Sequence, residues 1–174
     1  VSYLSGLRDF SKDYSSKIWA KMYVDKNNSI IFTDENGCDE FLRNYEQELI
    51  VDKSSINAHD YKLIKKPISR QSEVKIMKSK KNTLEIDAYK YAFEATDKAV
   101  MAIRRYIEEN DELSEYDISE KLREEFFKYG AKSLSFNSIV AINQNSALAH
   151  YAKNSKEAIL RDGDLVLIDC GAYY

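Results

Sequence analysis

The order of hydrophobic and polar residues divides the chain into a strand-rich first part and a helix-rich second part. Residues 18–24 and 29–33 are rich in hydrophobic residues, and residues 25–28 between them tolerate the left-handed backbone of a tight turn. This pattern predicts a β-hairpin. Helical spacing of hydrophobic residues predicts a helix over residues 39–48, and residues 49–52 predict one more strand. The order strand, strand, helix, strand is typical of a small α+β domain.

Weaker patterns flank this predicted domain. Residues 3–9 are a short apolar stretch broken by a glycine, which predicts a short strand or a turn. Ser54 or Ser55 can cap a short helix, and we expect His59 just after it to be solvated and without a functional role. Pro67 is the only proline in the chain. Because a proline holds the residue before it in an extended conformation, we place the domain boundary near Pro67.

Beyond this proline the periodicity becomes helical. One helix is predicted to begin at Ser72, and a longer one spans residues 83–110. In the longer helix, hydrophobic residues recur mostly at three- or four-residue steps, which predicts a side that faces the core. That side consists of Ile86, Tyr89, Phe93, Val100, Ile103 and Ile107.

A third helix is predicted to begin after Ser114. Ser114 is a favourable N-cap, and Asp117 places a carboxylate in the first turn. The predicted inner face consists of Ile118, Leu122, Phe126 and Phe127. Gly130 fits the left-handed residue that commonly follows the end of a helix.

The last part of the chain predicts two strands that flank a histidine-bearing segment. Residues 136–143 predict the first strand, and residues 165–170 predict a buried strand that carries Asp169. Because side chains alternate along a strand, Asp169 shares a face with Leu167, and Cys170 points to the opposite face. A carboxylate among apolar neighbours is costly unless a cation or hydrogen-bond donors meet it. Two interpretations of Asp169 follow. It is either a metal ligand or catalytic residue, or a structural residue that accepts hydrogen bonds from backbone N–H groups of the following turn.

Composition narrows the class of protein. The 174 residues carry a net charge of −3, and 32% of them are charged, with both signs represented. This composition indicates a soluble protein and gives no sign of the excess positive charge that binds nucleic acid. No apolar run reaches the length of a membrane span, and the N-terminus lacks the basic-then-apolar order of a signal peptide. Cys38 and Cys170 lack a spacing motif and are predicted to be free thiols of a reducing compartment. We therefore expect a cytoplasmic protein without a membrane partner.

Three segments near the end of the chain carry a resemblance to a known family. Residues 135–141, 145–151 and 163–173 resemble, in order and spacing, the first half of a pita-bread metallopeptidase catalytic domain of the aminopeptidase P and prolidase branch. The methionine aminopeptidase branch is less similar, because it has Cys-His-Gly where this chain has Ala149-His150-Tyr151.

The resemblance implies a domain organisation within the α+β class. Residues 1–66 would be the C-terminal part of a creatinase-like N-terminal α/β domain, and residues 67–174 the first half of a pita-bread catalytic domain. In this family five ligands hold two metal ions, and only the first of them, at the position of Asp169, falls within this chain. The chain is thus expected to be a piece of a longer protein and to be inactive by itself.

The resemblance also implies an activity, which is hydrolysis of the bond between an N-terminal residue and a following proline. The cofactors would be two divalent metal ions, manganese first, with zinc or cobalt as alternatives. Asp169 would bind one ion with both oxygens. His150 would be catalytic and would hydrogen-bond the substrate. Phe136 would help to wall the proline pocket, although packing in the core explains it equally well.

Three functions remain open at this point. The first is an aminopeptidase P-like enzyme, the second a prolidase-like dipeptidase, and the third a pita-bread module that binds peptides or proteins without catalysis. The expected partner is a peptide with proline at its second position, and homodimer formation is left open. Residues following Tyr174 would separate enzyme from binding module, because the enzyme needs a second Asp, a His and two Glu there.

Overall fold

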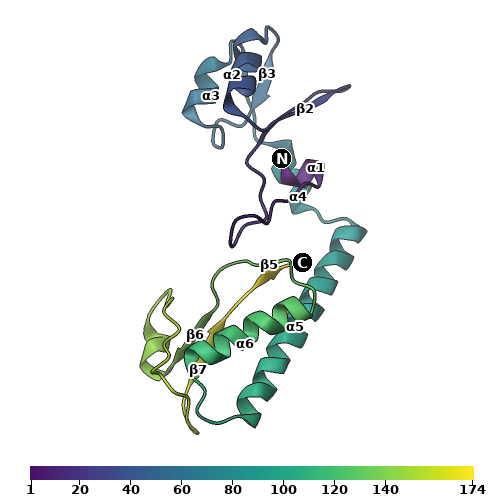
Figure 1. Cartoon of the computed structure of the whole chain (residues 1–174). Coiled ribbons are helices and arrows are strands. Elements are labelled where there is room, and N and C mark those ends of the chain that lie inside the picture. Colours follow the sequence, from purple (N-terminus) through teal and green to yellow (C-terminus); the bar gives the residue numbers. More distant parts are fainter. The chain divides into compact units, whose positions relative to one another are not determined.

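The computed structural model describes residues 1–174, which divide into two units that we describe separately (Figure 1). The first unit consists of residues 1–8 and 17–82, and the second of residues 9–16 and 83–174. Each of the four two-stranded sheets lies within one unit, so the predicted hairpin does not share a sheet with the strand that carries Asp169.

In chain order the first unit contains α1 (Ser2–Ser5), β1 (Lys21–Val24), β2 (Ser29–Phe32), α2 (Glu35–Asn44), β3 (Leu49–Val51), α3 (Ala58–Leu63), β4 (Pro67–Ser69) and α4 (Glu73–Ser79). The predicted hairpin is present, with β1 and β2 antiparallel. Its turn is fixed by Asp25, whose carboxylate accepts from the backbone N–H groups of Asn27 and Asn28. The predicted strand at residues 49–52 is β3, which pairs in parallel with β4.

The boundary between the units lies after Asn82 and not near Pro67. Pro67 begins β4, and because β4 pairs with β3 this proline belongs to the first unit. The proline occupies the first position of its strand, where a missing N–H group is tolerated.

Other local predictions for the first unit need correction. Residues 3–9 contain no strand, since α1 occupies the first of them; it ends at Ser5 and is followed by Gly6 with a left-handed φ of 72°. The predicted helix at 39–48 begins earlier and ends earlier, as α2, because the carboxylate of Asp34 caps its start. Asn57 caps α3, whereas the hydroxyl of Ser54 donates to Asp52 instead.

The second unit contains α5 (Thr83–Glu109), α6 (Glu115–Lys128), β5 (Ser133–Leu134), β6 (Ile139–Ile142), the 3-10 helix η1 (Asn143–Ala147), β7 (Val166–Asp169) and β8 (Ala172–Tyr173). Helix α6 packs against α5 and against β6, as Figure 1 shows. The core of the unit therefore lies between two helices and a two-stranded antiparallel sheet of β6 and β7.

The predicted bounds of α5 are confirmed to within one residue, but the predicted core-facing side is largely wrong. Ile86, Tyr89, Phe93 and Val100 are exposed, with Phe93 68% exposed. The buried residues of α5 are Ala95, Ala99 and Ile103. Short alanine side chains allow α6 to pack closely against α5. The contact between the two helices therefore lies along the small residues of α5 and not along its large hydrophobic ones.

Helix α6 matches its prediction more closely. Ser114 and Asp117 form a reciprocal capping box, and Gly130 has the expected positive φ of 95°. The predicted inner residues Ile118, Leu122 and Phe126 are fully buried. Phe127 is 44% exposed, because it follows Phe126 directly and a helix turns consecutive side chains to different sides.

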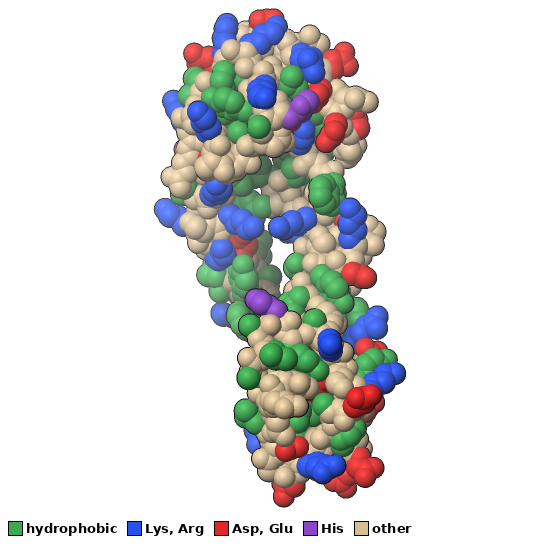
Figure 2. Space-filling model, turned by 90° about the vertical axis from the view of Figure 1, so that its left-hand side faces the viewer, with side chains coloured by type: hydrophobic (Ala, Val, Ile, Leu, Met, Phe, Trp, Pro, Cys, Tyr) green, Lys and Arg blue, Asp and Glu red, His purple; other side chains and the backbone are tan.

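No helix of the chain combines the length and the apolar character that crossing a membrane requires. On the face shown in Figure 2, basic and acidic side chains are interspersed with hydrophobic ones.

Both cysteines are free, as predicted, and burial raises the pKa of the Cys170 thiol.

Candidate active site

Asp169 ends β7 and presents an unpaired carboxylate to solvent. It lies opposite Ile139 in the antiparallel pairing of β6 and β7. The alternation predicted for this strand is confirmed, since Ile168 packs on the core while Leu167 and Asp169 are exposed. The expected apolar enclosure is absent, because Leu165 is 64% and Leu167 is 41% exposed. No hydrogen bond or ion pair occupies the carboxylate, so its oxygens are available to a cation.

Phe136 lies at the same end of this sheet as Asp169. The backbone N–H of Ser135 donates to the carbonyl of Gly171 at 2.9 Å. A Cβ atom at Gly171 would lie 2.6 Å from the Ser135 hydroxyl and 3.4 Å from the Phe136 ring. The steric conflict would be with Ser135, whereas the half-buried Phe136 ring would meet such a Cβ at van der Waals distance, so Phe136 lies beside the turn that follows Asp169.

His150 is exposed and lies in the loop between η1 and β7. The loop leaves β6 after Ile142, which is the end of the sheet opposite Asp169. The backbone of His150 is left-handed, with a φ of 56°. The side chain is thus not buried, and no hydrogen bond joins it to Asp169.

Glu115, the first residue of α6, was not among the residues predicted to be functional. Its side chain is fully buried although it is acidic. One carboxylate oxygen accepts from the backbone N–H of Ile142 and the side-chain amide of Asn145, both at 2.8 Å. The other accepts from the Tyr151 hydroxyl at 2.6 Å and the backbone N–H of Ser155 at 2.8 Å. The sequence did contain a sign that Glu115 is buried. Glu115 lies at helical spacing from Ile118 and Leu122, on the same face of the predicted helix.

The charge state of this group follows from its partners. Burial alone would raise the pKa of Glu115, but the four hydrogen bonds, that of Tyr151 foremost, hold its pKa below the usual range. Burial and the bond to Glu115 raise the pKa of Tyr151. Tyr151 is therefore a protonated donor to an ionised carboxylate at neutral pH.

Asn154 is a second anchor of the same loop. Its side-chain oxygen accepts from the backbone N–H of Val140 at 3.0 Å, and its amide donates to the carbonyl of Ser138 at 2.8 Å and to the Ser119 hydroxyl at 2.9 Å. Asn154 and Glu115 together satisfy N–H groups on the edge of β6 that does not pair with β7. The loop that bears His150 is thereby held along a sheet edge that would otherwise be open.

The buried carboxylate makes stability depend on pH in a defined direction. Because the folded pKa of Glu115 lies below its ordinary value of 4.5, the unfolded chain binds the proton first on acidification. The stabilisation is present above pH 4.5 and is lost as the pH falls through the folded pKa. Between pH 7 and pH 3, the melting temperature of Glu115→Gln should therefore depend less on pH than that of the wild type. Equal slopes of melting temperature against pH in the two proteins would contradict this account.

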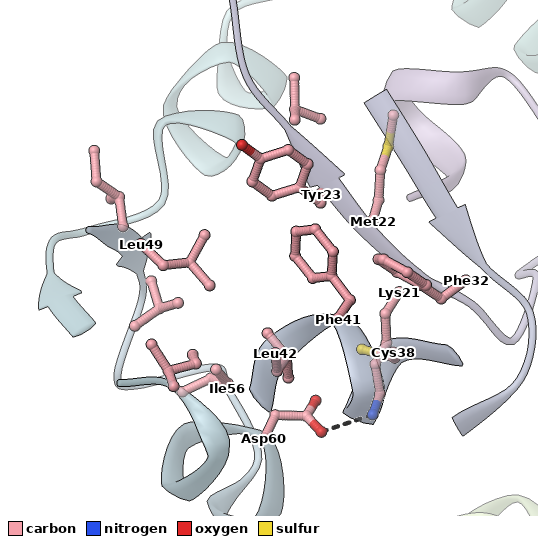
Figure 3. Close-up of a pocket in the computed structure, with 14 residues that line it drawn as sticks. Lys21, Met22, Tyr23, Phe32, Cys38, Phe41, Leu42, Leu49, Ile56 and Asp60 are labelled. Atoms are coloured by element: carbon pink, nitrogen blue, oxygen red, sulfur yellow. Dashed lines mark hydrogen bonds and ion pairs between the residues drawn. The ribbon is translucent and has the colours of Figure 1, made fainter. Parts of the chain in front are cut away.

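The first unit holds a separate cluster, formed by Asp39, His59 and Asp60, whose candidate ligand atoms lie within 4.8 Å of one another. Other side chains already meet the carboxylates of this cluster. The Lys21 ammonium is 2.7 Å from Asp60 and the His59 ring is 2.8 Å from Asp39. Figure 3 shows the Lys21–Asp60 pair at the side of a largely apolar cavity of about 200 Å³. Neither this cavity nor the cluster contains a predicted site residue, and His59 is exposed as expected.

The chain is similar to known peptidases in sequence. The model of metallopeptidase family M24 matches residues 87–174, which is half of the chain. An Xaa-Pro aminopeptidase of Escherichia coli (strain K12) is 43% identical over 60 residues, 34% of this chain and 13% of the relative. An Xaa-Pro dipeptidase of Pyrococcus furiosus is 34% identical over 122 residues, 70% of this chain and 32% of the relative.

A solved structure supports the fold. The Xaa-Pro dipeptidase from Bacillus anthracis matches 99% of this chain with a TM-score of 0.74 and 23% identity. The match covers 54% of that structure, so the chain spans about half of its length. The family match over residues 87–174, together with this shared architecture, shows that the chain belongs to metallopeptidase family M24, whose catalytic domain has the pita-bread fold.

Proposed function

We propose that the whole protein is a metal-dependent peptidase that removes an N-terminal residue from a following proline, as an Xaa-Pro aminopeptidase does. The observation that carries this proposal is the exposed, unpaired carboxylate of Asp169 at the end of β7, with Phe136 at the same end of the sheet. Membership of the M24 family implies divalent metal ions and peptide substrates.

The residues present fit such a metal site only in part. Carboxylate oxygens are the donors that hard divalent ions prefer, and those of Asp169 have no competing partner. One carboxylate does not hold two ions, so we propose that the other ligands come from residues that follow Tyr174 in the whole protein. We propose manganese as the metal. Bound there, the ions would supply an activated water and stabilise negative charge on the substrate carbonyl.

The chain's own residues would have two further tasks. The exposed His150 would donate a hydrogen bond to the substrate near the scissile carbonyl, where negative charge develops during hydrolysis. Phe136 would form an apolar wall for the proline ring. Its half-buried ring leaves one part in contact with the fold and another part accessible.

A prolidase-like dipeptidase is the second candidate. One observation favours it: the Pyrococcus furiosus Xaa-Pro dipeptidase aligns with 70% of this chain, whereas the Escherichia coli Xaa-Pro aminopeptidase aligns with 34%. The two activities differ in whether the substrate continues beyond the proline.

A pair of substrates separates these candidates. The whole protein loaded with manganese should release the first residue from an Xaa-Pro-Xaa tripeptide faster than it cleaves the matching Xaa-Pro dipeptide, with an Xaa-Ala-Xaa tripeptide as the negative control. Release can be followed by chromatography. Faster cleavage of the dipeptide would establish the dipeptidase instead, and binding of metal without cleavage of either peptide would leave only a binding module.

A further inference from the structure

We propose that Glu115 is a positioning residue that fixes the His150 segment in the conformation needed to meet the substrate. This inference rests on the proposed role of His150, and it assigns a task to a residue in a different element, the first turn of α6. The carboxylate does not act on the substrate itself, since it is fully buried.

The hydrogen-bond donors to Glu115 bracket His150 along the chain. Asn145 precedes the histidine, Tyr151 follows it directly, and Ser155 lies further on. The backbone of Ile142 ties the same carboxylate to the last residue of β6. One rigid group on a packed helix thus holds both arms of the loop and the strand from which the loop departs.

The loop conformation needs such an anchor because its backbone is unfavourable. Asn143, His150 and Asn154 all lie in the left-handed region, with φ values of 48°, 56° and 41°. Residues other than glycine adopt this region at a cost in free energy and retain it only where their surroundings enforce it. Without the Glu115 bonds, we expect the loop to populate other conformations and the His150 side chain to move from its place.

A carboxylate suits this task better than an amide of the same size. All four partners of Glu115 donate hydrogen bonds, and an ionised carboxylate offers acceptors only. In Glu115→Gln, one oxygen would be replaced by an NH₂ group, which would face donors and leave a buried N–H without an acceptor. The substitution therefore changes the anchor while keeping its volume.

The chain offers a matched control on the same helix. Glu125 is also buried, at 5% exposed, but its carboxylate pairs with Lys121 and Lys128 and does not contact the loop. Glu125→Gln thus makes the same chemical change to a buried α6 carboxylate, away from His150.

The test measures kcat, KM and metal content of the whole manganese-loaded protein on an Xaa-Pro-Xaa tripeptide. Glu115→Gln should lower kcat by about tenfold at unchanged metal content, a typical effect of losing a group that orients a functional side chain. Glu125→Gln should keep kcat at the wild-type value. Equal kinetic losses in the two variants, or none in Glu115→Gln, would overturn the proposal.

A double-mutant cycle separates positioning from a general structural role. If Glu115 acts through His150, Glu115→Gln should cause no further loss of kcat/KM in a His150→Ala background. Multiplicative losses would overturn the positioning role while leaving the proposed function intact. No loss in His150→Ala alone would instead refute the proposed role of His150.

A milder variant covers the case in which Glu115→Gln does not fold. Tyr151→Phe removes a single donor to the carboxylate and leaves the backbone donors in place. It should lower kcat in the same direction by a smaller factor, and this loss too should vanish in the His150→Ala background. An unchanged kcat in a folded Tyr151→Phe protein would count against the anchor.

Discussion

Asp169→Asn in the whole manganese-loaded protein should reduce kcat/KM on an Xaa-Pro-Xaa tripeptide by about a thousandfold or more, which corresponds to roughly 4 kcal/mol of transition-state stabilisation. Asparagine keeps the shape of the side chain but removes the negative charge that would face a divalent ion. Because Asp169 is exposed and makes no hydrogen bond within the chain, the fold should be retained.

The measurement pairs kinetics with metal analysis. Asp162→Asn is a suitable control, since it removes a charge from an exposed aspartate in the loop before β7. It should leave activity and metal content unchanged, whereas Asp169→Asn should lose both. Normal activity at normal metal content in Asp169→Asn would refute the role of Asp169 as a ligand.

The second large effect concerns His150. His150→Ala should lower kcat/KM by about a hundredfold, because it removes a hydrogen bond made mainly in the transition state, while the metals remain bound. The melting temperature should change little, since the side chain is exposed and has no partner in the chain.

The backbone of His150 requires its own control. At a φ of 56°, alanine could disturb the loop for reasons unrelated to the imidazole. His150→Gly removes the same side chain at a residue type that adopts this φ readily. Both variants should lose activity to the same extent. Recovery of kcat/KM in His150→Gly would show that the backbone, and not the imidazole, matters.

Local chemistry made much of the second unit predictable. The Ser114 cap, the left-handed Gly130 and the alternation that places Asp169 with Leu167 each depend on a few neighbouring residues, and each was confirmed. The pairing of β6 with β7 agrees with the prediction of two strands around a histidine-bearing segment.

Features that depend on distant residues could not be predicted in this way. The buried face of α5 follows Ala95 and Ala99, whose small side chains become important only because α6 packs on them. The hydrogen-bond partners of Glu115 lie between Ile142 and Ser155, and the spacing of residues within α6 does not predict them. Exposure of Asp169 likewise depends on which side of the sheet the helices cover. The roles of Asp169, His150 and Phe136 stay predictions until the experiments above are done.

The exposed face of β7 has one further consequence, which concerns solubility. Asp169 is the only charged side chain from Leu165 to Cys170, and it shares its face with two exposed leucines. Short apolar segments of high β-propensity and low charge are prone to self-association, and a single charge often opposes it. The carboxylate proposed to bind metal would thus also keep this strand from pairing with another copy. Activity lost in Asp169→Asn is informative only for the monodisperse fraction of the protein.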